Sequence, residues 1–130
     1  MYVADTHALV HYAFSRKPLL GKNAKRIFER ADSGETIVFV PSVVLWEISL
    51  LAELGRLRLS QTFEHWCRSL DNKPGFSIVS LEWLDIKEAR YLPFSDPFDR
   101  FVAGTALRLD AVLITKDREI VDSNRVQTVW

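Results

Sequence analysis

The chain has 130 residues but only one cysteine, Cys67, which excludes an internal disulfide and a cysteine-based zinc cluster. Its 17 Lys and Arg residues balance 17 Asp and Glu residues, so the sequence lacks the basic character of a dedicated duplex-DNA-binding protein. No apolar run approaches the roughly 20 residues of a membrane span. The amino terminus has neither the basic nor the apolar segment of a signal peptide. We therefore expect a cytoplasmic protein with no membrane attachment.

A hydrophobic fraction of 48% and a charged fraction of 26% are typical of a globular protein. The length suits one domain, which we expect to span residues 1–130. Short apolar runs alternate with amphipathic segments, and this alternation predicts a three-layer α/β/α fold with a mainly parallel central sheet. The expected strands cover 2–4, 36–40, 76–79, 111–114 and 126–130; the expected helices cover 7–14, 22–32, 42–54, 60–70, 82–91 and 97–109.

The stretch from Asp96 to Asp117 gives the clearest local prediction. Asp96-Pro97 is a helix N-cap followed by a first-turn proline, and apolar residues then recur at helical spacing. The following run, residues 111–114, is continuously apolar, as expected of a strand buried on both faces. A helix that leads into such a strand forms a parallel α/β unit, and ligand sites in these folds lie beyond the carboxyl ends of the strands.

Glu47 is the acid whose position is hardest to explain by a structural role alone. Ser42 is expected to cap the helix that contains it, and Gly55 to end that helix. Glu47 shares a helix face with Val44 and Leu51, so it points toward the apolar side. A carboxylate there is costly unless it is paired. Arg56 or a lysine, a metal ion or a shared proton would each meet this need.

Four other acids have both a structural and a functional interpretation. Asp5 and Asp117 each end an expected strand, where an acid can also cap the next helix. Asp96 is best explained as a cap. Asp99 is the third residue of its helix, where it favours the helix dipole, but it also lies on the apolar stripe. Individually these positions decide nothing.

The predicted fold brings the acids together. Asp5 and Asp117 end neighbouring strands, and Glu47 and Asp99 face the same edge from their helices. Carboxylates crowded in this way raise one another's pKa values, and Mg²⁺ or Mn²⁺, which prefer oxygen ligands, relieve the repulsion. Such ions activate water and clamp phosphodiesters, so the pattern indicates a nuclease site. Hydroxyl groups expected to orient the acids belong to Thr6, Ser42 and Thr115.

The order of four segments, DTHAL, PSVVLWEISLLAELGRL, LPFSDPFDRFVAGTA and LITKD, resembles the PIN-domain ribonucleases. More narrowly, it resembles the VapC-type toxins of bacterial type II toxin–antitoxin pairs. The resemblance covers nearly the whole chain. It implies Mg²⁺- or Mn²⁺-dependent endonucleolytic cleavage of RNA, inhibition by a cognate antitoxin, and a homodimer. The metal-site acids it implies are Asp5, Glu47, Asp99 and Asp117, with Asp96 as an auxiliary residue.

The sequence departs from this family at two positions. Many relatives have a histidine just before the D-P-F-D-R motif, where this chain has Phe94-Ser95. Many also have a lysine four residues after the middle glutamate, where this chain has Leu51. Both differences concern how RNA is held and how fast it is cut. Arg100 follows the key acid, where it would contact either a phosphate or a surface carboxylate.

Other functions remain open at this stage. A phosphatase that uses Asp5 as nucleophile would need a second acid where this chain has His7. A phosphate-receiving domain would use Lys116 but lacks the required acid pair. A non-catalytic PIN-like module would use the same cleft to bind RNA or protein. We interpret His7, His11 and His65 as structural or exposed. Part of the apolar surface of helix 42–54 is available for dimerisation or antitoxin docking.

Overall fold

The computed structural model describes residues 1–14 and 16–130, with the side chain of Lys17 also outside the described part. The elements are β1 (Tyr2–Ala4), α1 (Thr6–Ala13), the 3-10 turn η1 (Lys17–Leu19), α2 (Lys22–Asp32), β2 (Val38–Pro41), α3 (Ser42–Glu53), α4 (Phe63–Asp71), β3 (Phe76–Val79), α5 (Trp83–Ala89), α6 (Pro97–Arg108), β4 (Val112–Ile114), α7 (Arg118–Ser123) and β5 (Thr128–Val129).

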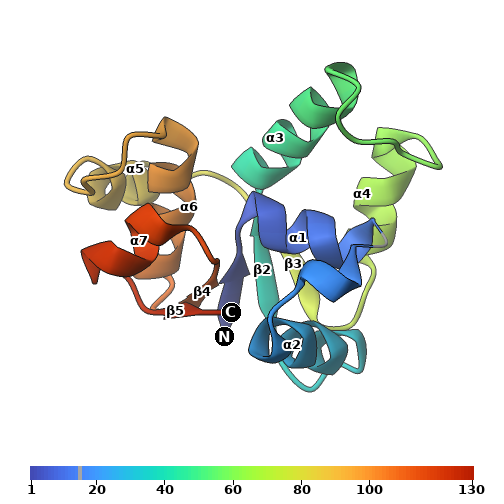
Figure 1. Ribbon diagram of the computed structural model, residues 1–130, viewed down its shortest axis with the longest axis horizontal. Helices are drawn as coiled ribbons and strands as arrows, with labels where there is room; N and C mark the ends of the chain where they lie inside the picture. The colour runs from blue at the N-terminus through green and yellow to red at the C-terminus, as the bar shows by residue number, and fades with distance from the viewer. Residues whose placement is uncertain (15) are drawn as a thin grey trace.

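The strands form one sheet in the order β3-β2-β1-β4-β5, and every pair of neighbours is parallel. Crossovers between parallel strands are right-handed. Because β2 and β3 lie on one side of β1, and β4 and β5 on the other, the two sets of connecting helices cover opposite faces. Figure 1 shows α1 to α4 in one half of the molecule and α5 to α7 in the other. The predicted three-layer α/β/α fold is confirmed.

The order in which strands are added to the sheet reverses between β1 and β4. These two strands are hydrogen-bonded neighbours, in register from Tyr2 opposite Val112 to Ala4 opposite Ile114. In open α/β sheets, such a reversal leaves a crevice outside the carboxyl ends of the two strands, because their connecting helices leave toward opposite faces. The residues that follow these two strands are Asp5 and Asp117. The fold therefore places both acids at the expected position of a ligand site.

Several element boundaries differ from the prediction. Helix α2 has the predicted bounds, but α4 begins at Phe63 rather than Ser60, because the hydroxyl of Thr62 caps it by accepting from the N–H of His65. The prediction that Ser42 caps α3 is wrong. Strand β2 continues directly into α3, so the extended Pro41 takes the N-cap position and Ser42 is the first helical residue.

The ends of two helices depend on left-handed backbone conformations. Gly55 follows α3 with φ of 70°, as its predicted role at the helix end requires. The end of α6 has no glycine, and Asp110 takes the left-handed conformation instead, with φ of 50°. Asp and Asn tolerate this region better than other side chains do.

Helices α5 and α6 pack closely, which fixes the helix that contains Asp99. The buried carboxylate of Asp85 accepts from the guanidinium of Arg108 and from the backbone N–H of Glu82. Gly104 faces the same turn of α5, and a Cβ placed on it would lie 2.4 Å from the carbonyl oxygen of Asp85. This contact requires glycine. No helix in the described part of the chain combines the length and apolarity needed to cross a bilayer.

We expect Gly104→Ala to destabilise the fold by about 1–3 kcal/mol through overpacking. At an open helical position the same change would stabilise it by about 1 kcal/mol, so the sign is diagnostic. Urea unfolding followed by circular dichroism measures the difference. Ser69→Ala, on the exposed side of α4, is the control and should change stability by no more than about 0.5 kcal/mol. An alanine at 104 that leaves stability unchanged or raises it would contradict the close α5–α6 packing.

Candidate active site at the carboxyl edge of the sheet

Asp5 and Asp117 occupy equivalent positions at the ends of β1 and β4. Asp5 caps α1, with Oδ1 accepting from the N–H of Ala8 at 2.6 Å, and Asp117 caps α7, with Oδ1 accepting from the N–H of Ile120 at 3.1 Å. The expected capping role is therefore present at both acids. Each cap uses one oxygen of its carboxylate, so capping does not exclude a role in binding a ligand.

Thr115 forms hydrogen bonds with both Asp5 and the residue Asp117. Its side chain is fully buried, and its hydroxyl accepts from the backbone N–H of Asp117 at 3.1 Å. The same side chain hydrogen-bonds the carboxylate of Asp5 and opposes the rise of its pKa. The net pKa of Asp5 is raised, because burial outweighs this bond. Thr115 thus orients Asp5 and the backbone at Asp117, as an orienting hydroxyl should.

Glu47 reaches the cluster from α3. The hydroxyl of the buried Thr6 donates to its Oε1 at 2.7 Å. Burial raises the pKa of Glu47, the hydrogen bond from Thr6 opposes the rise, and the negative charges of Asp96 and Asp5 add to it. Within the described part of the chain Glu47 has no ion pair with Arg56 or with a lysine. Its charge is therefore not paired with a lysine or arginine among these residues.

Asp99 is a strongly perturbed acid of the cluster. It lies in the first turn of α6, whose N-cap is Asp96, with Oδ1 accepting from the N–H of Phe98 at 2.8 Å. Burial raises the pKa of Asp99 to about 7, with further contributions from the negative charges of Asp96, Asp117, Glu47 and Asp5. The negative charges of the other four acids therefore all act on Asp99. No Lys or Arg ion pair to any of them occurs among the described residues.

Two predicted auxiliary residues have other partners. The Ser42 hydroxyl accepts from the N–H of Leu81 at 3.2 Å, which ties the start of α3 to the segment after β3. The guanidinium of Arg100 donates through Nε to the carbonyl of Phe94 at 2.5 Å, which holds the segment before α6. The structure thus brings Thr6 and Thr115 to the acids, whereas Ser42 and Arg100 bind the chain that surrounds them.

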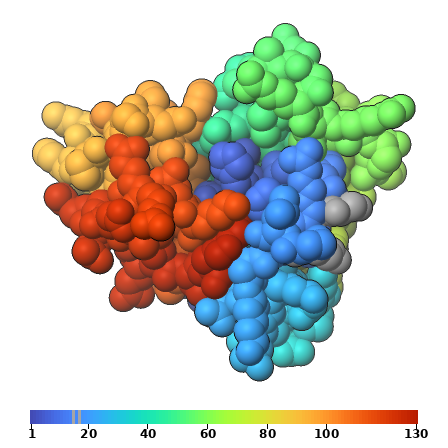
Figure 2. Space-filling model, viewed as in Figure 1, coloured from blue at the N-terminus to red at the C-terminus, as the bar shows by residue number. Residues whose placement is uncertain are grey.

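His7 lies beside the acids, which the sequence interpretation missed. Its side chain is exposed, and its positive charge lowers the pKa values of both Asp5 and Glu47. The available signal was its position two residues after Asp5, at the start of the helix that Asp5 caps. Figure 2 shows the dark blue start of the chain between the teal segment of α3 and the orange segment of α5 and α6.

The donor chemistry suits a hydrated divalent cation. All the converging ligands are carboxylate oxygens, which Mg²⁺ and Mn²⁺ prefer. Among the described residues, no three His, Cys, Asp or Glu side chains are grouped closely enough to hold an ion between them as they stand. Mg²⁺ usually keeps several waters and binds through one or two carboxylates. The cluster therefore fits an ion held by one or two direct ligands and by water to the other acids.

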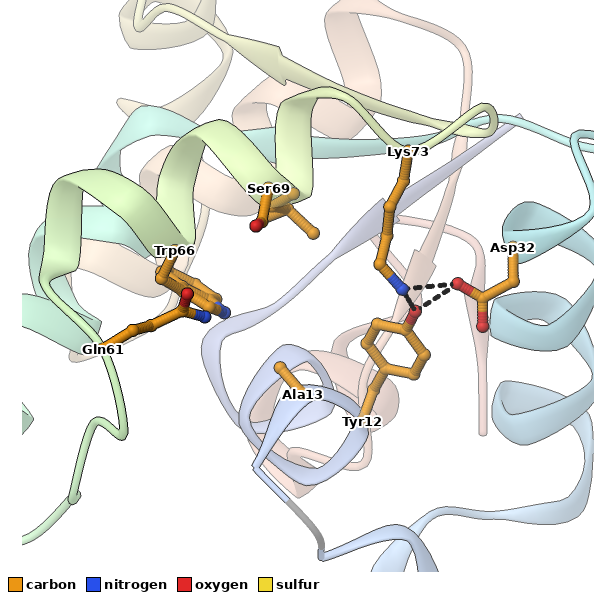
Figure 3. Close-up of a pocket in the computed structure, with 8 residues that line it drawn as sticks. Tyr12, Ala13, Asp32, Gln61, Trp66, Ser69 and Lys73 are labelled. Carbon is orange, nitrogen blue, oxygen red and sulfur yellow. Dashed lines mark hydrogen bonds and ion pairs between the residues drawn. The ribbon is translucent and has the colours of Figure 1, made fainter.

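A separate cavity of about 590 Å³ opens between α1, the end of α2 and α4. Figure 3 shows Tyr12, Asp32 and Lys73 joined on one side of it. The Lys73 ammonium donates to the Tyr12 hydroxyl at 2.5 Å and to Asp32 at 2.7 Å. Burial and the bond to Asp32 raise the pKa of Tyr12 to about 12. This network joins the ends of α1 and α2 to the turn before β3, at the edge of the sheet opposite the acids.

This chain is a doubly wound parallel α/β domain with five acids near its topological switch point, and folds of this class bind ligands beyond the strand ends. The PIN domain family profile matches residues 2–125. The chain belongs to the PIN domain family. A comparison with curated protein sequences found no significant match.

Solved structures support the same fold at low sequence identity. VapBC2 from Rickettsia felis, bound to a DNA fragment from its promoter, has a TM-score of 0.71 at 14% identity, covering 99% of this chain and 98% of that one. FitAcB from Neisseria gonorrhoeae has a TM-score of 0.67 at 14% identity, with coverages of 100% and 97%. A toxin–antitoxin complex from Klebsiella pneumoniae has a TM-score of 0.66 at 14% identity, again with coverages of 100% and 97%.

The raised pKa of Asp99 predicts how stability without metal depends on pH. Because the folded protein holds this proton to about pH 7, against a normal value of 3.8, the contribution of Asp99 is full below pH 3.8 and is lost as the pH rises to 7. Asp99→Asn mimics the protonated acid and removes this loss. In chelator, the variant should therefore gain stability relative to wild type from pH 5 to pH 8, as measured by urea unfolding.

Asp110→Asn is the matched control, because Asp110 is an exposed acid outside the cluster whose left-handed backbone asparagine tolerates. Its stability relative to wild type should vary little over the same range. A constant difference between Asp99→Asn and wild type from pH 5 to pH 8 would show that the pKa of Asp99 is not raised in the folded protein.

Proposed function

We propose that this chain is a Mg²⁺- or Mn²⁺-dependent endoribonuclease and the toxin of a type II toxin–antitoxin pair. The observation that carries the proposal is the cluster of Asp5, Glu47, Asp99 and Asp117, with Asp96. Burial and neighbouring carboxylates raise the pKa values of Asp5, Glu47 and Asp99, and the cluster has no arginine or lysine ion pair among the described residues. Membership of the PIN domain family supports it. So does the structural similarity to VapBC2 and to a toxin–antitoxin complex.

The chain's own groups would hold the metal, the water and the proton in a defined arrangement. Asp5, Asp99 and Asp117, with Glu47, are the groups that would hold the cation, directly or through water. When bound, Mg²⁺ or Mn²⁺ lowers the pKa of a water molecule and stabilises charge on the phosphodiester. Thr6 fixes Glu47, and Thr115 fixes Asp5. With these rotamers held, little reorganisation of the carboxylates is required during the reaction.

The main alternative is a non-catalytic PIN-like module that uses the cleft to bind RNA or protein. The cluster argues against it, because crowding and burying carboxylates destabilises a fold unless a ligand offsets the cost. A module that only binds RNA would be expected to have lysine and arginine side chains at this edge of the sheet instead of acids. A metal-dependent nuclease therefore explains why the acids are clustered, whereas a non-catalytic binding module does not.

The antitoxin and a second copy of the chain are proposed partners, in a cytoplasmic setting without membrane attachment. Helix α3 is apolar on most of its surface, yet Trp46 within it is 54% exposed and Leu54, its C-cap residue, is 65% exposed. Large exposed apolar groups on one helix are typical of protein–protein interfaces. These residues support an interface on α3.

The catalytic proposal predicts cleavage of single-stranded RNA in Mg²⁺ or Mn²⁺ that a chelator abolishes. Asp5→Asn and Asp99→Asn should each lower the rate by about a hundredfold or more, because each removes a group that binds the ion or the proton. A fluorescently labelled RNA resolved on a denaturing gel measures the rate. Asp110→Asn is the control and should cut at the wild-type rate. Tight RNA binding without cleavage in every metal would favour the non-catalytic module.

Cation binding also predicts a change in thermal stability. An ion at ten times its dissociation constant should stabilise the fold by about 1.4 kcal/mol, which raises the melting temperature by several degrees in a chain of this size. Asp99→Asn should show a much smaller rise, and Asp110→Asn the same rise as wild type. Differential scanning fluorimetry with Mn²⁺, Mg²⁺ and chelator measures it. Equal melting temperatures of the wild type in all three would rule out a cation at the cluster.

A further inference from the structure

A hollow of about 350 Å³ lies between α7 and β5, directly beside the acid cluster. Thr115, which contacts Asp5 and Asp117, forms part of its wall, and Lys116, Arg118 and Trp130 line it as well. Trp130 follows β5 at the carboxyl edge of the sheet, because β5 is parallel to β4. Figure 2 shows this red end of the chain against the blue segment of α1 and α2.

The hollow combines positive charge with an aromatic ring. Lys116 and Arg118 are exposed, and neither forms an ion pair within the described part of the chain. The Lys116 ammonium lies 5.4 Å from the centroid of the Trp130 ring. His11 packs edge-on against that ring, at 6.2 Å between centroids. Burial lowers the pKa of His11, and the positive charges of Lys116, His7 and Arg16 lower it further, so cationic groups gather on this side of α1.

This arrangement matters because the acids repel the substrate that they would cut. A cluster of carboxylates disfavours the phosphates on either side of the scissile bond, so cationic groups next to it must bind them. The guanidinium of Arg100, the basic group nearest to Asp99 in sequence, already donates to a backbone carbonyl. Lys116 and Arg118, which flank Asp117 in the sequence, are not engaged in this way.

We infer that the hollow binds one nucleotide of a single-stranded RNA next to the scissile phosphate, with Lys116 and Arg118 on a phosphate and Trp130 stacked on the base. This inference rests on the proposed nuclease function. The volume lies at the lower end of the range for small-molecule sites. Stacking on aromatic rings beside a basic groove is the usual means of binding single strands without strong sequence preference.

Asp122 determines the orientation of the nucleotide. Its carboxylate also lines the hollow, so a phosphate inside would meet an opposing charge, whereas a base would meet a hydrogen-bond acceptor. The phosphate therefore belongs at the rim, with the exposed Lys116 and Arg118, and the base inside, against Trp130. A duplex offers no unstacked base to this site, so the hollow favours single strands.

Binding is measured separately from cleavage, by fluorescence anisotropy of a labelled 12-nucleotide RNA in chelator, with every variant made in the Asp99→Asn background. Lys116→Ala/Arg118→Ala should weaken binding about tenfold or more at low salt. It should also reduce the slope of log K against log salt by about 1.4 if each residue neutralises one phosphate. Arg56→Ala/Arg58→Ala removes two exposed charges from the loop between α3 and α4 and is the matched control, with less than a twofold effect expected.

Trp130 tests the stacking part of the inference. Trp130→Leu should weaken binding about fivefold or more without changing the salt slope, and Trp130→Phe should retain most of the affinity, because a ring remains. Thermal melting shows whether both variants stay folded, which matters because the Trp130 ring also packs against Gly21. An RNA duplex of the same sequence should be insensitive to Trp130→Leu.

The results separate this inference from the proposed function. Cleavage by the wild-type protein, with equal RNA affinity of Lys116→Ala/Arg118→Ala and the control, would overturn the subsite and leave the nuclease intact. Loss of binding in the test variants, together with no cleavage by the wild-type protein in any metal, would support RNA binding at the hollow and overturn the nuclease. Equal affinity of Trp130→Leu and Trp130→Phe, both folded, would overturn the assignment of the base to the hollow.

Discussion

Repulsion among carboxylates at the end of the β1–β4 pair is the constraint on which the rest of the site depends. Asp5, Asp96 and Asp117 each accept a backbone N–H at the start of a helix, and the positive end of a helix dipole favours an acid there. Backbone donors and two threonine hydroxyls therefore hold the acids in place, with no lysine or arginine ion pair to them among the described residues. The charge of His7 offsets only part of the negative charge at Asp5 and Glu47. The net negative charge that remains favours the binding of a divalent cation.

The same arrangement explains why the capping and functional interpretations of these acids coexist. A parallel strand that ends in an acid places it at the carboxyl edge, and the following helix begins there, so an N-cap and a ligand group coincide. Glu47 is different, because it lies inside α3 and no cap accounts for it. Its hydrogen bond with Thr6 joins α3 to α1, so the residue after Asp5 in the sequence also orients the acid contributed by another helix.

The sequence predicted the sheet, the helices and the convergence of the acids, because each follows from local periodicity and from the geometry of parallel strands. It did not predict contacts between distant segments. Ser42 bonds Leu81, and Lys73 bonds Tyr12 across 61 positions. Hydroxyl, ammonium and phenol groups have several acceptable partners, and only the folded chain selects among them. The position of His7 beside Glu47 was missed for the same reason, since it depends on how α1 meets α3.

The departures from the family pattern leave the acids unchanged and alter their surroundings. In the Phe94-Ser95 segment, where the resemblance leads us to expect a histidine, the backbone N–H and the hydroxyl of Ser95 both donate to the carboxylate of Glu119, at 2.8 and 3.0 Å. Glu119 lies two residues after Asp117, and Ser95 directly precedes Asp96. This pair of bonds therefore ties the segment before α6 to α7, so that Asp96 and Asp117 are held in place relative to each other. A histidine side chain has no hydroxyl to make the second bond, so in this chain position 95 positions the acids that follow it.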